Sequence, residues 1–294
     1  MRRRTEDHDE RDGGILALPV SAHRTAVERA LATMRGPLDR PLPVATLAEI
    51  AGLSPFHFTR TFRQATGIPP GQFLAALRLE RAKELLLTTE LTVTEICFAV
   101  GYDSIGTFTT RFTRSVGLSP GRIRQLPDLL TEAVAHLPNR PPAPPIVQTT
   151  TDTPGVAGQL DAPDNGEAFI FVGLFPAAIP QCRPVVGTLL TAPGPFRLAA
   201  PPDGRYHLLA AALPHPRDPL ACLLPAAALR VGHAAGTILV RGGRSATRAD
   251  IALRPPLPTD PPVLVALPAL LLDSCSWFGG DQNTARSARS EKRE

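Results

Sequence analysis

The chain has 294 residues and a formal net charge of +4, from 31 Lys or Arg and 27 Asp or Glu. This length predicts two domains. No apolar run reaches the roughly 18 residues of a membrane-spanning helix, and no apolar core follows the charged N-terminus, so membrane insertion and secretion are disfavoured. The four cysteines lie far apart without metal-ligand spacing. They argue against a zinc site or a disulfide framework and favour a reducing cytoplasm.

Residues 1–19 form a charged arm before the first predicted helix. Charges of both signs alternate from Met1 to Gly14, which is typical of a solvated, disordered segment. Direct contact of this arm with DNA is the alternative. Most basic residues are Arg, and Pro, Ala and Gly are abundant, a bias that we attribute to a GC-rich bacterial genome.

Residues 46–126 contain one unit written twice. The two copies align at the pairs Ile50/Ile96, Phe58/Phe108, Phe62/Phe112, Gly67/Gly117 and Pro70/Pro120, and the second copy is four residues longer between its helices. A repeat of this kind indicates a duplicated supersecondary unit.

Each copy contains the signals for a helix, a tight turn and a second helix. Thr46 and Thr92 each precede a Glu by three residues, which predicts a capping box at the start of the first helix. Gly52 and Gly101 are predicted to form the left-handed turn between the helices. Ser54-Pro55 and Asp103-Ser104 have the composition of an N-cap for the second helix.

The second helix of each copy presents an unusual outer face. With Phe58 and Phe62, or Phe108 and Phe112, as buried i, i+4 pairs, helical periodicity defines the opposite face. In the first copy that face has Phe56, Arg60, Arg63 and Gln64, and in the second it has Gly106, Thr107, Thr110, Thr113 and Arg114. Arg, Gln and an exposed apolar ring suit guanine, adenine and thymine edges in the major groove. An ordinary surface helix with one stray aromatic is the alternative.

Several motifs in order resemble the AraC/XylS family of transcription regulators. They are Leu47 to Phe62, Arg78 to Leu86, Val93 to Tyr102, and Arg111-Phe112 to Pro120. The resemblance implies a seven-helix DNA-binding domain with two helix-turn-helix units joined by a long helix, here Gly71 to Leu87. The apolar stripe of that helix is Phe73, Ala76, Leu79, Ala82 and Leu86.

The resemblance also implies which positions contact bases. They are Phe56, Thr59 and Arg60 in the first unit, and Ile105, Gly106, Thr107 and Thr110 in the second. The second unit departs from the family at Cys97-Phe98, where the family usually has small aliphatic residues, and at Ile105 to Thr107, where it usually has longer polar residues. We therefore expect specificity to be weighted to the first unit.

Phosphate contacts position a protein on DNA without reading its sequence. The residues predicted for this role are Ser54, His57, Ser104, Thr113, Arg114, Arg122 and Arg124, with Arg63 able to reach either a base or a phosphate. His57 could equally pack at the flank of its helix. Residues 40–126 contain ten Lys or Arg and six Asp or Glu, so DNA binding should weaken with salt.

The sequence changes character after residue 127. Residues 128–145 are expected to form a short helix and a Pro-rich spacer, which permits either an independent or a docked second domain. From 146 to 273 short apolar runs, punctuated by Pro and Gly, predict an all-β sandwich. The runs are 168–175, 185–190, 195–198, 206–210, 237–240 and 263–267. Residues 194–210 resemble transthyretin-like or carboxypeptidase-regulatory sandwich domains. Residues 274–294 are predicted to be a disordered tail.

No motif for catalysis, a cofactor or a metal is present in the sequence. His207, His215 and His233 lack metal-ligand spacing and are expected to be scattered surface residues. Cys97 should be buried and inert, while a redox sensor is the alternative. The Pro-Cys-His motif of the DNA-repair relatives is missing. We therefore expect a protein that is not an enzyme.

The predicted fold is an all-α double helix-turn-helix domain followed by an all-β sandwich, and the predicted function is sequence-specific binding of a double-stranded DNA operator to regulate transcription. The β region could bind a small-molecule effector, hold a dimer together or contact RNA polymerase, and the sequence does not choose among these roles. The alternative is an architectural or adaptor protein that anchors to DNA and recruits partners through its β domain.

Overall fold

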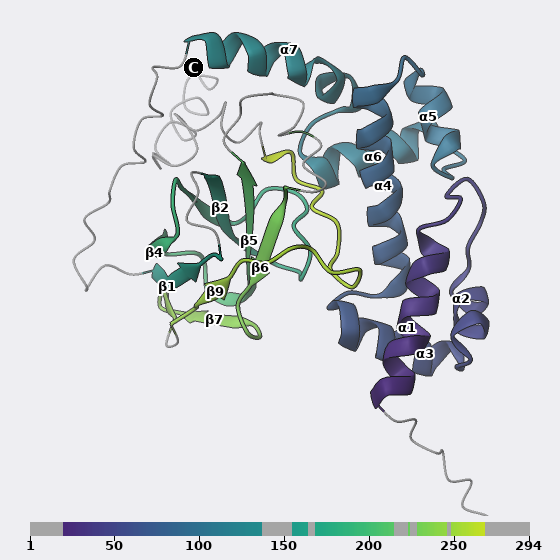
Figure 1. The fold of residues 1–294 in the computed structure, drawn as a ribbon, viewed down its shortest axis with the longest axis horizontal. Helices are drawn as coiled ribbons and strands as arrows, with labels where there is room; N and C mark the ends of the chain where they lie inside the picture. Colours follow the sequence, from purple (N-terminus) through teal and green to yellow (C-terminus); the bar gives the residue numbers. More distant parts are fainter. Residues whose placement is uncertain are drawn as a thin grey trace, which may run out of the picture.

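A computed structural model describes residues 20–136, 155–163, 168–214, 223, 228–245 and 248–267. The predicted arm at 1–19, the Pro-rich spacer at 138–145 and the tail at 274–294 lie outside the described residues, as do His215, Cys222 and Cys275. The N-terminal helical segments up to residue 116 lie on one side of the molecule and the strands on the other, while the last helix, residues 120–136, runs along the top of the view above the strands (Figure 1). No helix in the described ranges is long and apolar enough to cross a membrane.

The helical region contains the two predicted helix-turn-helix units. Its helices are α1 (Val20–Met34), α2 (Val44–Ala51), α3 (Pro55–Thr66), α4 (Pro70–Thr88), α5 (Val93–Ala99), α6 (Ile105–Val116) and α7 (Pro120–His136). Helices α2 and α3 form the first unit, α5 and α6 form the second, and α4 joins them. The seven helices and the long joining helix are as predicted.

The N-terminal caps explain where these helices begin, and one predicted cap is wrong. The hydroxyls of Ser54 and Ser104 each accept a backbone N–H at 3.4 Å, from His57 and Thr107. Thr92 and Glu95 form the predicted capping box, with bonds of 3.2 and 2.7 Å. Thr46 forms none, because α2 begins two residues earlier at Val44, after Pro43. The Pro43 carbonyl accepts the N–H of Leu47 at 3.2 Å, so Thr46 lies inside the first turn.

This difference between the two copies gives a matched pair of variants. We expect Thr92→Ala to lower the free energy of unfolding by about 1 kcal/mol, because it removes a side-chain cap. Thr46→Ala should be neutral or slightly stabilising, since Thr46 is exposed inside α2 and Ala is the better helix former. Urea denaturation of the full chain measures both effects. An equal loss of unfolding free energy in the two variants would contradict the assignment of Thr92 as a cap and of Thr46 as a residue inside α2.

The core of the helical region is built on four phenylalanines and one face of α4. Phe58, Phe62, Phe108 and Phe112 are fully buried. The ring of Phe62 meets Phe73 of α4 edge-on, with centroids 5.5 Å apart. The predicted α4 stripe is buried along its whole length. The Phe62–Phe73 contact packs α3 on α4, and Phe108 and Phe112 of α6 belong to the same buried cluster.

Helix α7 is longer than the sequence predicted. The helix expected after residue 127 is the second half of α7, which continues through Pro127. An interior proline costs about 3 kcal/mol in an isolated helix. Here Ile123, Leu126 and Leu130 are buried on both sides of it, so packing of one apolar face holds the helix together.

The β region contains two sheets. Its strands are β1 (Gly155–Asp161), β2 (Ala168–Phe175), β3 (Val186–Leu190), β4 (Gly194–Ala199), β5 (Gly204–Pro214), β6 (Arg230–His233), β7 (Ile238–Arg241), β8 (Arg244–Ser245) and β9 (Ile251–Ala252). One sheet has the order β4-β1-β9, and the other has β3-β2-β5-β7-β8 with β6 also paired to β5. Strands of both sheets contribute to one apolar cluster, which includes Val156, Leu198, Val172 and Leu208.

Five of the six predicted strands correspond to β2, β3, β4, β5 and β7, but the strand predicted at 263–267 is wrong. That segment has no strand partner in the described structure. The amides of Leu264 and Val265 donate to the Pro180 carbonyl, and the amide of Ala266 donates to Val116 at the end of α6. Leu264 and Ala266 pack into the helical core, whereas Val265 and Leu267 pack into a cluster on the sheet. Successive side chains of this segment do point to opposite sides, but one side packs on the helical core and the other on the sheet.

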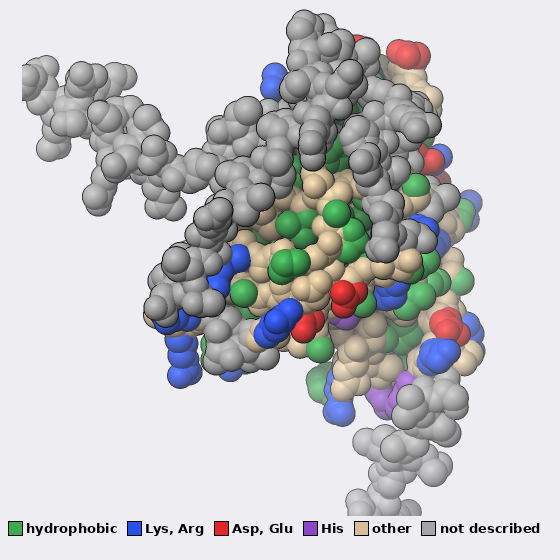
Figure 2. All heavy atoms as spheres, turned by 60° about the vertical axis from the view of Figure 1, so that its left-hand side comes forward, with side chains coloured by type: hydrophobic (Ala, Val, Ile, Leu, Met, Phe, Trp, Pro, Cys, Tyr) green, Lys and Arg blue, Asp and Glu red, His purple; other side chains and the backbone are tan. Residues whose placement is uncertain are grey.

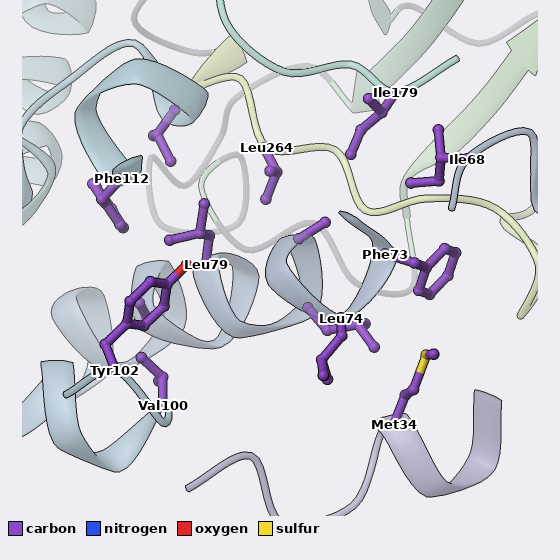
Figure 3. Packing of buried hydrophobic residues seen from close by; sticks show 14 of the residues in the cluster. Met34, Ile68, Phe73, Leu74, Leu79, Val100, Tyr102, Phe112, Ile179 and Leu264 are labelled. Atoms are coloured by element: carbon purple, nitrogen blue, oxygen red, sulfur yellow. The ribbon is translucent and has the colours of Figure 1, made fainter. Parts of the chain in front are cut away.

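The β region is docked on the helices. Ile179 and Leu264 are buried within the helical core and lie over α4 near Leu79 (Figure 3). The backbone N–H of Cys182 donates to the Ser115 carbonyl at 2.6 Å, and that of Ala266 to the Val116 carbonyl at 3.1 Å. Of the two arrangements that the spacer permits, the structure has the docked one.

Candidate nucleic-acid interface

The outer face of α3 is exposed and carries the side chains that the sequence predicted. Phe56 is 82% exposed, although it is a large apolar residue. Arg60, Arg63 and Gln64 are exposed on the same helix, while Phe58 and Phe62 are buried on the opposite side. The predicted exposure of Phe56 is therefore confirmed.

Thr59 is less available than its neighbours. Its side chain is half-buried, and its hydroxyl donates to the Pro55 carbonyl at 2.8 Å. The hydroxyl hydrogen is therefore used inside α3, so that only the oxygen lone pairs and the methyl group remain for an outside partner.

The corresponding face of α6 is exposed but has short side chains. Ile105 is 45% exposed, and Gly106, Thr107, Thr110 and Arg114 are exposed as well, with Thr113 half-buried. A Cβ atom added at Gly106 would meet only the Ser104 hydroxyl, at 3.9 Å. The glycine is therefore not required by packing, and α6 offers fewer hydrogen-bonding groups than α3.

Two predicted phosphate contacts have internal partners. The ring of His57 packs edge-on against His23 of α1, with centroids 5.3 Å apart, so it does pack at the helix flank. The guanidinium of Arg124 donates to the carbonyls of Leu86 and Leu91. Arg124 thus ties the end of α4 to α7, and its predicted contact with a phosphate stays a prediction. Arg122 is exposed.

The turns that orient α3 and α6 differ in their surroundings. Gly52 and Gly101 both have the predicted left-handed conformation, with φ of 70° and 77°. Arg78 of α4 donates to the Gly101 carbonyl at 3.0 Å and to the Arg40 carbonyl at 2.9 Å. This positioning role was missed, because the sequence pattern marked α4 only by its apolar stripe.

The remaining candidate residues show no chemical site. Cys97 is fully buried, and burial raises the pKa of its thiol, as expected for an inert residue. His207 and His233 are not scattered: burial lowers the pKa of His207, and the nearby charge of His233 lowers it further. Within the described ranges no three His, Cys, Asp or Glu side chains are grouped to hold a metal.

On the one face of the molecule seen in Figure 2, the described charged side chains are dispersed. The described Lys and Arg side chains of that face are separated from one another and have Asp and Glu among them. Other large apolar side chains are also exposed, among them Phe98 of α5 at 54% and Leu91 at 36%, and neither exposure was predicted.

Comparisons with known proteins agree with a protein of the double helix-turn-helix class. A helix-turn-helix domain model matches residues 47–126. The transcriptional activator AarP of Providencia stuartii is 30% identical over 114 residues, which span 36% of this chain and 84% of AarP. The activator RhaR of Klebsiella pneumoniae is 32% identical over 108 residues, 36% of this chain and 38% of RhaR. This chain belongs to the AraC family of helix-turn-helix transcription regulators.

The family model matches residues of the helical region, and the relatives match less than half of this chain. The chain spans 38%, 35% and 54% of the length of three further regulators of this class, from Bacillus subtilis, Rhizobium meliloti and Mycobacterium tuberculosis. Among solved structures, an AraC-type regulator from Chromobacterium violaceum is 26% identical, covers 35% of this chain and 93% of its own, and has a TM-score of 0.34.

Proposed function

We propose that this protein is a sequence-specific DNA-binding transcription regulator in which α3 and α6 enter successive major-groove segments on one face of the duplex. The observation that supports this most is the exposed Phe56 beside Arg60, Arg63 and Gln64 on one face of α3. Successive major-groove segments are about 34 Å apart, and α4 would fix this spacing. One chain could then bind a non-palindromic site.

The two helices would contribute unequally. Arg60 and Arg63 can donate to guanine, Gln64 can pair with adenine, and Phe56 or the Thr59 methyl can contact a thymine methyl. On α6 the exposed residues Ile105, Gly106, Thr107 and Thr110 suit thymine methyls and a few base edges. Specificity would therefore depend mainly on the half-site bound by α3.

Backbone phosphates would hold the protein in register. Ser54 and Ser104 cap the N-termini of α3 and α6, where exposed N–H groups favour an anion. Thr113, Arg114 and Arg122 would add contacts at the flanks, and His57 would act by supporting the helix through His23. Such contacts fix orientation without reading sequence.

The role of the β region is part of the same proposal. Its shared apolar cluster supports the sandwich predicted from the sequence, and its docking on α4 and α6 favours a regulatory role over that of an independent adaptor. Contact with RNA polymerase and action in the bacterial cytoplasm are expected of such a regulator. An architectural protein that anchors to DNA without preference is the competing function.

Selection of bound duplexes from a random DNA pool by the full chain tests this function. We expect one enriched motif, and Arg60→Ala should cost about 1–3 kcal/mol at a single base position while other positions are unaffected. Arg248→Ala is the matched control, because Arg248 pairs with Asp250 on the β region. A pool without enrichment, or an equal loss for all sequences in Arg60→Ala, would favour the architectural function.

A further inference from the structure

One loop of the β region contacts both helix-turn-helix units. Residues 176–183 connect β2 to β3. Ala178 lies under Gly67 at the end of α3, so close that a Cβ atom on Gly67 would come within 2.9 Å of the Ala178 Cβ. The backbone N–H of Cys182 donates to the Ser115 carbonyl near the end of α6. Any shift of this loop would therefore reach both candidate DNA-binding helices.

A cleft of about 560 Å³ lies between this loop, α4 and α6. Its volume falls within the range of about 300–1,000 Å³ that is usual for small-molecule sites. Ala75, Ala76 and Leu79 of α4 line one wall, and Ile179 and Leu264 of the β region are also part of the lining. Figure 3 shows Ile179 and Leu264 on the same side of α4 as Leu79. These residues offer an apolar surface to a ligand.

The other wall is positively charged. Arg111 and Arg114 of α6 line the cleft, together with Arg183 of the loop, and its described lining contains no Asp or Glu. Arg111 and Arg114 are three residues apart and thus lie on neighbouring positions of one helix face. Burial raises the pKa of the Cys182 thiol, and the Arg114 charge opposes that rise. Arg114 and Cys182 thus line the same cleft, and the Arg114 charge lies close enough to act on the thiol.

We infer that this cleft binds a small organic anion, with its carboxylate held by Arg111 and Arg114 and its hydrocarbon part against Ala75, Ala76 and Leu79. Arg111 and Arg114 are both exposed, and Arg111 also interacts with the Tyr102 hydroxyl. The described lining of the cleft offers them no carboxylate, so a bound anion would supply the opposite charge. A planar carboxylate also matches the paired N–H groups of guanidinium. A neutral apolar ligand would make no ion pair with either arginine.

The anion would regulate DNA binding, a consequence that rests on the proposed function. Arg114 is also the proposed partner of a DNA phosphate, so an anion in the cleft competes for its guanidinium. The loop that closes the cleft contacts α3 and α6 as well. DNA binding should weaken when the anion is bound, and by reciprocity DNA should weaken anion binding by the same factor.

The test measures binding of hexanoate and phenylacetate to the full chain by calorimetry, with hexanamide and phenylacetamide as uncharged probes of the same shape. We expect saturable binding of the acids and at least tenfold weaker binding of the amides. Arg111→Gln should weaken binding of the acids about tenfold. Ala75→Leu, which fills the cleft and leaves both arginines in place, should do the same. Arg81→Gln is the matched control, since Arg81 pairs with Glu84 outside the cleft.

Binding of neither acid would overturn the inference. Equal binding of acids and amides, or acid binding that survives both Arg111→Gln and Ala75→Leu, would also overturn it. These measurements contain no DNA, so failure of the proposed function leaves them interpretable. Regulation is then tested by titrating the selected duplex with and without hexanoate, against chloride at equal ionic strength. Unchanged affinity for DNA would remove the regulatory role and leave the binding site.

Discussion

Gly101→Ala should unfold much of the second helix-turn-helix unit. Gly101 has a φ of +77°, where an L-residue costs about 1–2 kcal/mol. A Cβ atom there would also overlap the Leu38 carbonyl oxygen and come within 2.8 Å of the Arg78 guanidinium. Overpacking of this kind typically costs about 1–3 kcal/mol. We therefore expect a loss of about 2–5 kcal/mol in the free energy of unfolding.

The first unit provides the matched control. Gly52 occupies the same place in the repeat, with a φ of +70°, and a Cβ atom there would meet nothing within 4 Å. Gly52→Ala should therefore lower the free energy of unfolding by only about 1–2 kcal/mol, the cost of placing an L-residue in the left-handed conformation. Urea denaturation of the two variants, followed by circular dichroism, measures the difference. If the free energy of unfolding falls by the same amount in both variants, the close packing of Gly101 against Leu38 and Arg78 is wrong.

Lys83 should make the stability of the docked protein depend on pH. Its ammonium group donates to the Val263 carbonyl at 2.7 Å and to the Leu264 carbonyl at 3.3 Å. Burial lowers the pKa of Lys83 from 10.5 to about 8, and the nearby Glu80 carboxylate opposes this shift. Between these two values the unfolded chain keeps a proton that the folded chain has released. The free energy of unfolding should therefore rise with pH in this window.

The size of the rise in unfolding free energy follows from the pKa shift of Lys83. One pKa unit corresponds to about 1.36 kcal/mol, so the contribution of Lys83 should reach roughly 3 kcal/mol at the upper end of the window. Lys83→Met should abolish it and should leave two carbonyls without a donor. The Cys97 thiol and the Tyr102 hydroxyl, whose pKa values are raised by burial, titrate in both proteins. Their effects cancel in the difference between the two proteins.

Urea denaturation at several pH values from 7 to 10.5 measures this difference. Arg81→Met is the control on the same helix, because Arg81 makes only a surface ion pair with Glu84 and should follow the unmodified chain. Parallel curves for the unmodified chain and Lys83→Met would contradict the lowered pKa of Lys83, whose side chain is partly buried. Amide exchange of Leu264, Val265 and Ala266 should also accelerate in Lys83→Met, because these amides hold the docked segment to Pro180 and Val116.

Most of the helical region was predictable because its signals are local. Ser54 and Thr92 cap helices, Gly52 and Gly101 make left-handed turns, and the pairs Phe58/Phe62 and Phe108/Phe112 mark a buried face. Each signal acts within a few residues of its own position. The cap predicted at Thr46 failed for an equally local reason, since Pro43 starts α2 two residues earlier.

Long-range contacts were less predictable. Arg124 looked like a phosphate ligand, but it folds back to the Leu86 and Leu91 carbonyls at the end of α4. The segment 263–267 alternates like a strand, yet its two faces pack on different regions. In both cases the partner is distant in the sequence, and nothing near the residue indicates which partner it finds.

The sequence by itself determined the two helix-turn-helix units, the exposed face of α3 and the membership of the family, because capping, turn and helical periodicity depend on neighbouring residues. Tertiary structure alone decided the docking of the β region, the burial of Lys83 and the cleft beside Arg111 and Arg114. These features arise where residues 176–183 and 257–267 meet α4 and α6. Their free energy comes from burying apolar surface and pairing backbone groups between segments up to about 180 residues apart.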